Sequence, residues 1–177
     1  MIFTETKLRG AFLIEPELLR DERGFFARTY CEREFAACDL NVHWVQSSIS
    51  FNEKKGTLRG MHWQAAPYAE AKLVRCTSGA LYDAIIDLRV DSTTFKQWFA
   101  VELSAKNRLM LYIPEGLAHG FMTLEDETEI LYQMSEPFRP ECARGLCWND
   151  PAFAIHWPFK PTLISLRDLA LPLWKDT

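Results

Sequence analysis

Between residues 43 and 134 the chain is a succession of strand-like segments joined by short turns, and this pattern limits the fold more than any other. Runs rich in β-branched and aromatic residues lie at 43–50, 58–64, 71–77, 80–88, 97–103, 108–113, 119–124 and 129–134. Parallel strands would need crossover connections of about a dozen residues or more, and no helical pattern separates these runs. The sequence therefore predicts an all-β fold, a jelly-roll barrel of antiparallel strands with a few short helices.

The two ends of the chain add shorter elements. The sequence predicts strands at 11–15 and 25–30, with turn-forming residues at 20–24 between them. It also predicts a short helix at 32–40, and a turn at 165–168 that leads into a short helical end. Because no repeat or linker interrupts the pattern, we expect a single domain over all 177 residues.

Composition bears on partners. Hydrophobic residues make up 48% of the chain and aromatic residues 13%, so apolar surface must fill a large core or lie in a subunit interface, and we expect a homodimer. The formal net charge of -4 leaves no basic footprint for nucleic acid. An anionic ligand would have to be held by local arginines and lysines.

The cysteines and the N-terminus bear on location. The five cysteines are odd in number and contain no Cys-x-x-Cys pair, which argues against a disulfide framework or a thiolate zinc site. The N-terminus lacks the pattern of a signal peptide, and no stretch approaches the roughly 20 apolar residues of a membrane span. We expect a cytoplasmic protein with reduced thiols and no membrane contact.

Two stretches place a lone histidine in an apolar, glycine-bounded strand. In residues 56–64 Arg59 stands three positions before His62, and in residues 112–121 a tight turn leads to His119. A cation beside a titratable imidazole is typical of a site where an anionic ligand meets a proton-transfer group. A strand end whose polar residues reach solvent would have the same sequence pattern. Because two histidines occur in similar settings, we favour a functional site.

The turn Pro114-x-Gly116-x-x-His119 resembles the second signature of the cupin superfamily, whose barrels often hold a metal. The usual first signature supplies His-x-His and a glutamate, whereas this chain has His62-Trp63-Gln64. Two histidines without a carboxylate partner make a poor site for a transition metal. We therefore expect no metal and no other cofactor.

Lys72 and Tyr132 complete the set of polar residues that strands could bring into one interior. Each also has an ordinary structural explanation. A lysine at the start of a buried strand often extends to solvent, and a tyrosine in an apolar strand often belongs to the core.

From about Gly10 to Leu171 the chain resembles the dTDP-4-dehydrorhamnose 3,5-epimerases, metal-free dimeric cupins of deoxysugar biosynthesis. The resemblance rests on long motifs: Asp21-Glu22-Arg23-Gly24-Phe25-Phe26, Gly56-Thr57-Leu58-Arg59-Gly60-Met61-His62, Lys72-Leu73-Val74, Asp87-Leu88-Arg89, Ile113-Pro114-Glu115-Gly116-Leu117-Ala118-His119-Gly120-Phe121 and Trp148-Asn149-Asp150-Pro151.

The resemblance implies a role for each matching residue. His62 matches the catalytic base, Tyr132 the proton donor, and Asp168 the carboxylate that pairs with the base. Lys72, Arg59 and His119 match residues that hold the sugar carbonyl and the diphosphate. Arg23 and Phe26 match residues that reach the partner's site across the dimer. Gln46 and Ser48 stand where the family carries a Gln-Asp-Asn.

The chemistry of a 4-keto sugar explains these residue types. The ketone acidifies the protons on C3 and C5, so a base of near-neutral pKa can remove one if a cation stabilises the enolate oxygen. His62 and Lys72 would supply these functions. Inversion needs a new proton from the opposite face, which Tyr132 would deliver.

The chain departs from the family at several positions near the nucleotide or the sugar. The family usually has a glutamate at the position of Arg28, a tyrosine at Phe138, a second glutamate near Ala143 and a lysine at Arg167. The Asp-Asn that follows Gln46 in the family is Ser47-Ser48 in this chain. The nucleotide (dTDP, CDP, GDP or UDP) and the hexose or heptose therefore stay open, as does inversion at C3, at C5 or at both.

Two other functions stay open at this point. One is a nucleotide-sugar 3,4-ketoisomerase of the related cupin group, and the other is a non-catalytic cupin that only binds a nucleotide sugar. The presence of both His62 and Tyr132 argues against the second, because a binding protein needs neither.

Overall fold

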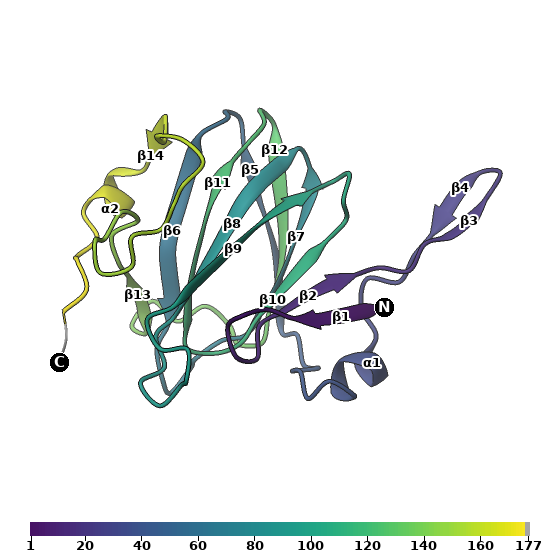
Figure 1. The fold of residues 1–177 in the computed structure, drawn as a ribbon, viewed down its shortest axis with the longest axis horizontal. Coiled ribbons are helices and arrows are strands. Elements are labelled where there is room, and N and C mark those ends of the chain that lie inside the picture. The colour runs from purple at the N-terminus through teal and green to yellow at the C-terminus, as the bar shows by residue number, and fades with distance from the viewer. Residues whose placement is uncertain (176–177) are drawn as a thin grey trace.

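The computed structural model describes residues 1–175, and two antiparallel sheets that face each other form its body (Figure 1). In spatial order, the first sheet consists of β1 (Ile2–Glu5), β2 (Phe12–Glu15), β10 (Met110–Ile113), β7 (Lys72–Ser78), β12 (Thr128–Met134) and β5 (Gln46–Asn52). The second consists of β13 (Ala143–Gly145), β6 (Thr57–Gln64), β11 (Leu117–Thr123), β8 (Ala80–Asp87) and β9 (Trp98–Ser104), with β14 (Leu163–Ile164) added in parallel to β6. The predicted all-β jelly-roll architecture is confirmed.

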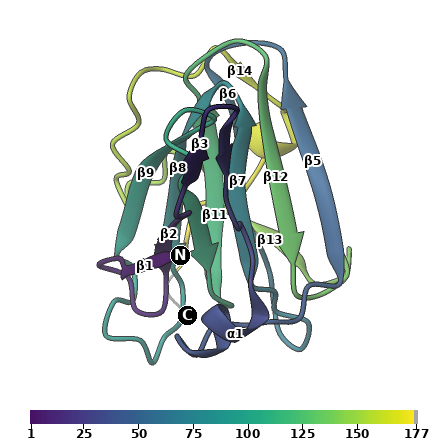
Figure 2. The same cartoon turned by 90° about the vertical axis from the view of Figure 1, so that its right-hand side faces the viewer.

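The remaining elements are short. A hairpin of β3 (Leu19–Asp21) and β4 (Gly24–Phe26) projects away from both sheets (Figure 1) and lies in front of them in the end-on view of Figure 2. Helix α1 (Glu32–Ala36) lies near the N-terminus and α2 (Leu166–Leu169) lies beside β14. Among the described residues no helix has the length and apolar character that would let it cross a membrane.

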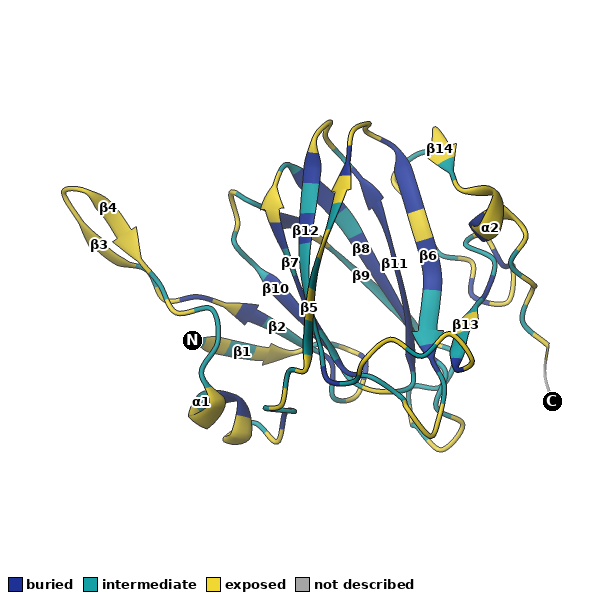
Figure 3. Cartoon of the chain, turned by 180° about the vertical axis from the view of Figure 1, so that it is seen from behind, coloured by how far each residue is buried: buried dark blue, intermediate teal, exposed yellow. Residues whose placement is uncertain are grey.

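The main core lies between the sheets, and each sheet is also covered on its outer face. Inside, Val74, Leu81 and Phe121 belong to a buried cluster that draws on both sheets. Outside, Phe35 of α1 covers the first sheet, and Phe153 in the C-terminal segment covers the second. Strands β10 and β11 are consequently buried along their whole length (Figure 3), which explains why they are apolar at nearly every position.

Some predicted boundaries are wrong near the N-terminus. The strand expected at 25–30 ends at Phe26, and the expected turn at 20–24 shrinks to residues 22–23, since residues 20–21 belong to β3 and Gly24 to β4. Tyr30 instead donates a hydrogen bond to the carbonyl of Val42 and packs against Phe35. The helix expected over 32–40 ends at Ala36, since the following residues form turns and Asp39 has φ of 55°.

The short strands β1, β13 and β14 were not predicted. Each spans at most four residues and owes its conformation to pairing with a neighbour. The turn predicted at 165–168 is instead largely the helix α2 itself, which the side chain of Ser165 caps through the backbone N–H of Asp168. The helical end predicted after it is wrong, since residues 170–175 form no helix.

Candidate active site

A cavity of about 470 Å³ opens between the two sheets near α2. Its wall contains most of the polar residues that the sequence singled out: Arg59, His62, Lys72, His119, Tyr132, Arg167 and Asp168, together with Ser50, Gly120, Phe121 and Ser165. The predicted catalytic residues therefore share one space.

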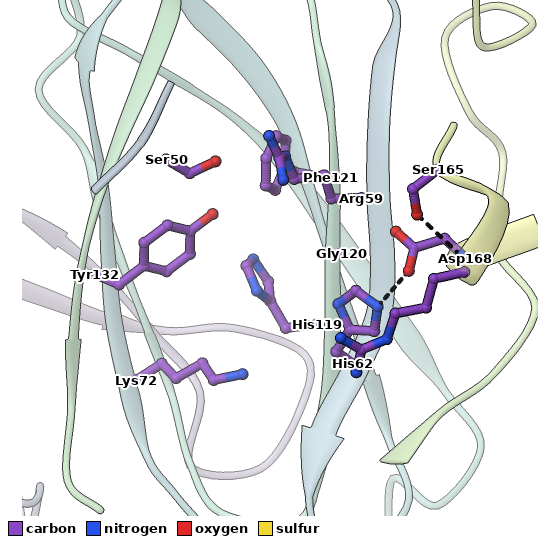
Figure 4. A pocket seen from close by; sticks show the side chains of 11 residues that line it. Ser50, Arg59, His62, Lys72, His119, Gly120, Phe121, Tyr132, Ser165 and Asp168 are labelled. Atoms are coloured by element: carbon purple, nitrogen blue, oxygen red, sulfur yellow. Dashed lines mark hydrogen bonds and ion pairs between the residues drawn. The ribbon is translucent and has the colours of Figure 1, made fainter. Parts of the chain in front are cut away.

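The two sheets contribute different chemical groups to this cavity. Strands β6 and β11 of the second sheet carry His62 and His119, while β7 and β12 of the first sheet carry Lys72 and Tyr132. Figure 4 shows the phenol and the ammonium extending toward the imidazoles from the opposite side. A ligand in this cavity would have a base and an acid on opposite faces.

Two glycines allow β6 and β11 to bring their side chains to this point. A Cβ on Gly60, whose φ is 120°, would lie 2.5 Å from the Cα of Gly120, so only glycine permits this backbone approach. The pairing of β11 with β6 shifts register between His119 and Phe121. Side chains three positions apart in a regular strand point to opposite faces, and this irregularity lets Arg59 and His62 line the same cavity.

His62 pairs with a buried carboxylate, as the resemblance implied. Its Nε2 lies 2.8 Å from Oδ1 of Asp168, and the backbone N–H of Gly60 donates to Oδ2 at 3.3 Å. Burial lowers the pKa of His62 below its ordinary 6.5; the charge of Asp168 opposes this shift, and Lys72 and Arg167 add to it. The imidazole is therefore neutral, and able to accept a proton, at neutral pH.

A second histidine–carboxylate pair was not predicted. Nε2 of His119 lies 2.7 Å from Oδ1 of the fully buried Asp83, whose Oδ2 has no hydrogen-bond partner within the described chain. The signal was present in the sequence, because an aspartate inside the apolar run 81–86 needs a buried polar partner.

The cations of the site also have partners that the sequence analysis missed. Nζ of Lys72 lies 3.0 Å from Oε1 of Glu70, with both side chains largely buried. Nε of Arg59 donates to Oδ1 of Asn52 at 2.8 Å. Both cations thus line the cavity with their positions fixed by a neighbouring side chain, and the charge of Lys72 is balanced by Glu70.

Tyr132 lies half-buried at the far side of the cavity, with its ring edge-on to that of His119. Burial, together with the charge of Asp83, raises the pKa of its phenol well above the ordinary value; Arg59 and Ser50 act in the opposite direction. The phenol therefore stays protonated at neutral pH, as a proton donor must.

A smaller cavity of about 210 Å³ adjoins the first one and shares His62, Lys72 and Arg167 with it. Phe138, Ala143 and Arg144 form part of its wall. Three of the positions where the chain departs from the family therefore lie beside the predicted catalytic residues.

The structure does not bring the remaining predicted residues to the cavity of the same chain. Arg23 pairs with Asp21 at the exposed end of the projecting hairpin, Phe26 is 71% exposed, and Arg28 pairs with Glu34. Gln46, near Ser48 at the start of β5, accepts a hydrogen bond from the backbone of Phe138. Substrate contacts by Arg23, Phe26, Arg28, Gln46 and Ser48 stay predictions.

Within residues 1–175 no three His, Cys, Asp or Glu side chains come together in a way that could hold a metal ion.

Comparison with known proteins identifies the family. A model of the dTDP-4-dehydrorhamnose 3,5-epimerases matches residues 5–176. A Salmonella typhimurium protein of that name is 42% identical over 176 residues, which cover 98% of this chain and 95% of its own. The Bacillus anthracis epimerase, solved with TDP and PPi bound, is 40% identical with a TM-score of 0.94 over 98% of this chain and 99% of its own.

A second solved structure carries a different specificity in its name. A 3'-monoepimerase from Streptomyces bikiniensis, in complex with dTDP-quinovose, is 29% identical with a TM-score of 0.87 over 95% of this chain and 85% of its own. Both the family model and the relatives match nearly the whole chain. The chain belongs to the dTDP-4-dehydrorhamnose 3,5-epimerase family.

Proposed function

We propose that the protein is an isomerase that inverts C3, C5 or both in a nucleotide-activated 4-keto-6-deoxy sugar, of the type that converts dTDP-4-dehydro-6-deoxyglucose to dTDP-4-dehydrorhamnose. One observation carries this proposal: a neutral imidazole held by a buried carboxylate faces a protonated phenol across one cavity. Inversion of a carbon needs a base and an acid placed in this way.

The first half of the reaction is proton removal. The imidazole of His62 takes a proton from C3 or C5, the C–H electrons form a C=C bond, and the C4 ketone becomes an enolate. The ammonium of Lys72 faces the same cavity and would stabilise the enolate oxygen. Asp168 stabilises the imidazolium that forms.

The second half is proton delivery from the other face. The phenol of Tyr132 donates to the same carbon, the C=C electrons form the new C–H bond, and the ketone returns. Tyr132 then regains a proton from solvent and His62 loses one, so the sugar is isomerised with no net change in protons. Arg59, Arg167 and His119 would hold the diphosphate and the sugar oxygens.

The direct test is solvent exchange. The protein is incubated in D2O with 4-keto-6-deoxy sugars linked to dTDP, CDP, GDP and UDP, and deuterium at C3 and C5 is followed by NMR. An epimerase incorporates deuterium with inversion, a ketoisomerase moves the carbonyl to C3, and a binding protein does neither. Comparison of the four nucleotides decides whether the replacements at Arg28, Phe138, Ala143 and Arg167 change which nucleotide the protein prefers.

We expect the acid limb of the pH profile of kcat/KM to lie below pH 6.5. His62 must be neutral to accept a proton, and burial lowers its pKa from 6.5, so activity is lost only as the pH falls through this lower value. In Asp168→Asn the opposing charge is gone, and the limb should move lower still while the maximal rate falls. A limb above pH 6.5 in the unmodified protein would contradict this assignment.

We also propose that the protein is a homodimer whose projecting hairpin completes the partner's site. The hairpin exposes Leu19 and Phe26, at 67% and 71%, and the outer face of β5 exposes Ile49 and Phe51, at 64% and 51%. A second copy of the chain would cover such apolar surface. Arg23 at the hairpin tip would then reach an anionic ligand in the other cavity.

Mixing two impaired variants tests the shared site. His62→Asn should be inactive and Arg23→Ala should be weak, but a mixed dimer contains one cavity with both His62 and the partner's intact hairpin. We expect activity to return after the two are unfolded and refolded together. His62→Asn mixed with Tyr132→Phe is the control, since every cavity then lacks one of the two. No recovery in the first mixture, with mixed dimers shown by mass spectrometry, would contradict the shared site.

A cytoplasmic location is also proposed. All five cysteines are free thiols, and three of them are only half-buried. Such thiols persist in a reducing compartment.

A further inference from the structure

The carboxylate that pairs with His62 belongs to a helix too short to be stable by itself. Asp168 belongs to α2, a helix of four residues with one side-chain cap from Ser165. A single helical turn is not stable by its own hydrogen bonds. The position of this carboxylate must therefore be fixed by the chain on either side of the helix.

Before the helix, the chain is fastened to the strand that carries His62. Leu163 and Ile164 of β14 pair with Thr57 and Leu58 at the start of β6. The backbone N–H of Thr162 donates to the carbonyl of Gly56 at 2.9 Å. This connection sets where α2 begins relative to β6.

After the helix, residues 170–175 form a segment that we call the C-terminal strap. Leu171 packs so closely on Gly145 that a Cβ there would lie 2.6 Å from its side chain. The backbone N–H of Cys147 donates to the carbonyl of Pro172 at 2.8 Å. These contacts tie the strap to β13 and to the loop that follows it.

The end of the strap is held by the Trp148-Asn149-Asp150-Pro151 motif. The carboxylate of Asp150, 3% exposed, accepts the N–H of Ala152 through Oδ1 and the N–H of Trp174 through Oδ2. The ring of Trp174 meets Phe153 edge-on, with centroids 5.8 Å apart. Neither Asp150 nor Trp174 lines the catalytic cavity.

We infer that Asp150 and Trp174 are positioning residues for the His62–Asp168 pair, acting through the C-terminal strap. The motif around Asp150 does not line the cavity, so substrate contact does not explain it. It would instead fix the far end of the C-terminal strap, and the strap would hold α2 against β6. The inference rests on the proposed function only in taking His62–Asp168 as the catalytic pair.

The test reads the imidazole itself and needs no substrate. The pKa of His62 is followed by NMR titration of the full chain, with its signal assigned by loss in His62→Asn. The charged and titratable groups around it are Arg59 from β6, Asp168 and Arg167 from α2, Lys72 from β7 with its partner Glu70, His119 from β11, Tyr132 from β12 and Arg144 from β13. Asp150 is not among them, so we expect its effect on the titration to pass through the position of Asp168, which the double variant tests.

We expect Asp150→Asn to lower the pKa of His62 by about 1 unit, as loss of a close opposite charge does. The amide cannot accept both backbone N–H groups, so the strap is released and Asp168 moves away from the imidazole. Asp168→Asn should cause a shift at least as large, and the double variant should shift no further than Asp168→Asn alone.

Two further variants complete the design. Trp174→Ala removes the ring at the end of the chain without opening the main core, and should shift the titration in the same direction even if Asp150→Asn fails to fold. Trp157→Phe is the control, since it removes the hydrogen bond from Nε1 to the carbonyl of Trp148 in the same region but leaves the strap attached.

An unchanged pKa of His62 in folded Asp150→Asn and Trp174→Ala would overturn the inference, as would a shift that adds to that of Asp168→Asn. If the protein instead lacked epimerase activity, the titration shifts would still stand, so the two failures are distinguishable. With activity present, kcat should fall about 10-fold in Asp150→Asn at unchanged KM, because a positioned base is lost in part.

Discussion

Replacing His62 with Asn is expected to abolish both product formation and the uptake of solvent deuterium into the sugar. Asn cannot accept a proton, so no enolate forms and neither C3 nor C5 exchanges. The expected loss in kcat is about 10⁴-fold, at the upper end for a positioned base. Substrate binding should persist, because the cations of the cavity are unchanged.

The measurement is a D2O incubation followed by NMR, with binding of dTDP measured by calorimetry. His156→Asn is a matched control, since His156 is an exposed histidine that meets Trp98 edge-on and does not line the described cavity. Deuterium uptake by His62→Asn at a rate near that of the unmodified protein would mean that another group removes the proton. His119 would then be the first alternative to test.

Changing Tyr132 to Phe is expected to separate exchange from inversion. The substitution removes only the hydroxyl and keeps the ring against His119, so proton removal by His62 can continue while delivery to the opposite face fails. Deuterium should then enter with the original configuration and little inverted product should form. The expected loss of inversion is about 10²–10⁴-fold.

Comparison of deuterium content with the configuration of the recovered sugar decides the outcome. Tyr82→Phe is the control, because it removes the hydroxyl of a tyrosine whose ring packs on Trp157 outside the cavity. If Tyr132→Phe inverts the sugar at close to the normal rate, the acid is another group or water. The assignment of the two faces of the cavity would then fail as well.

The architecture was predictable where local pattern and tertiary pairing agree. The alternation of apolar runs and tight turns after residue 43 predicted the long strands of both sheets to within a few residues. It did not predict β1 and β14, because strands this short are made by their neighbours. The bounds of β3 and β4 were predicted wrongly, because residues 20, 21 and 24 are typical of turns but pair as strand in this hairpin.

The lining of the cavity was predictable in its members but not in their contacts. His62, Lys72, His119 and Tyr132 stand out because each is polar in an apolar strand. Two carboxylate partners were missed, Asp83 of His119 and Glu70 of Lys72, because pairing across strands or around a turn depends on a register that the sequence does not display. Asp168, more than 100 positions from His62, was found through the resemblance alone.

The base and the acid of this site belong to different sheets, and this ties stereochemistry to packing. Stacked sheets stand about 10 Å apart, a spacing set by the side chains between them. Ile130 belongs to the same buried cluster as Phe121 of the cavity wall, so Ile130→Val, which removes one methylene, would change the packing beneath Tyr132 without touching any polar group. The distance between the two proposed proton-transfer groups therefore depends on the apolar interior as well as on His62 and Tyr132 themselves.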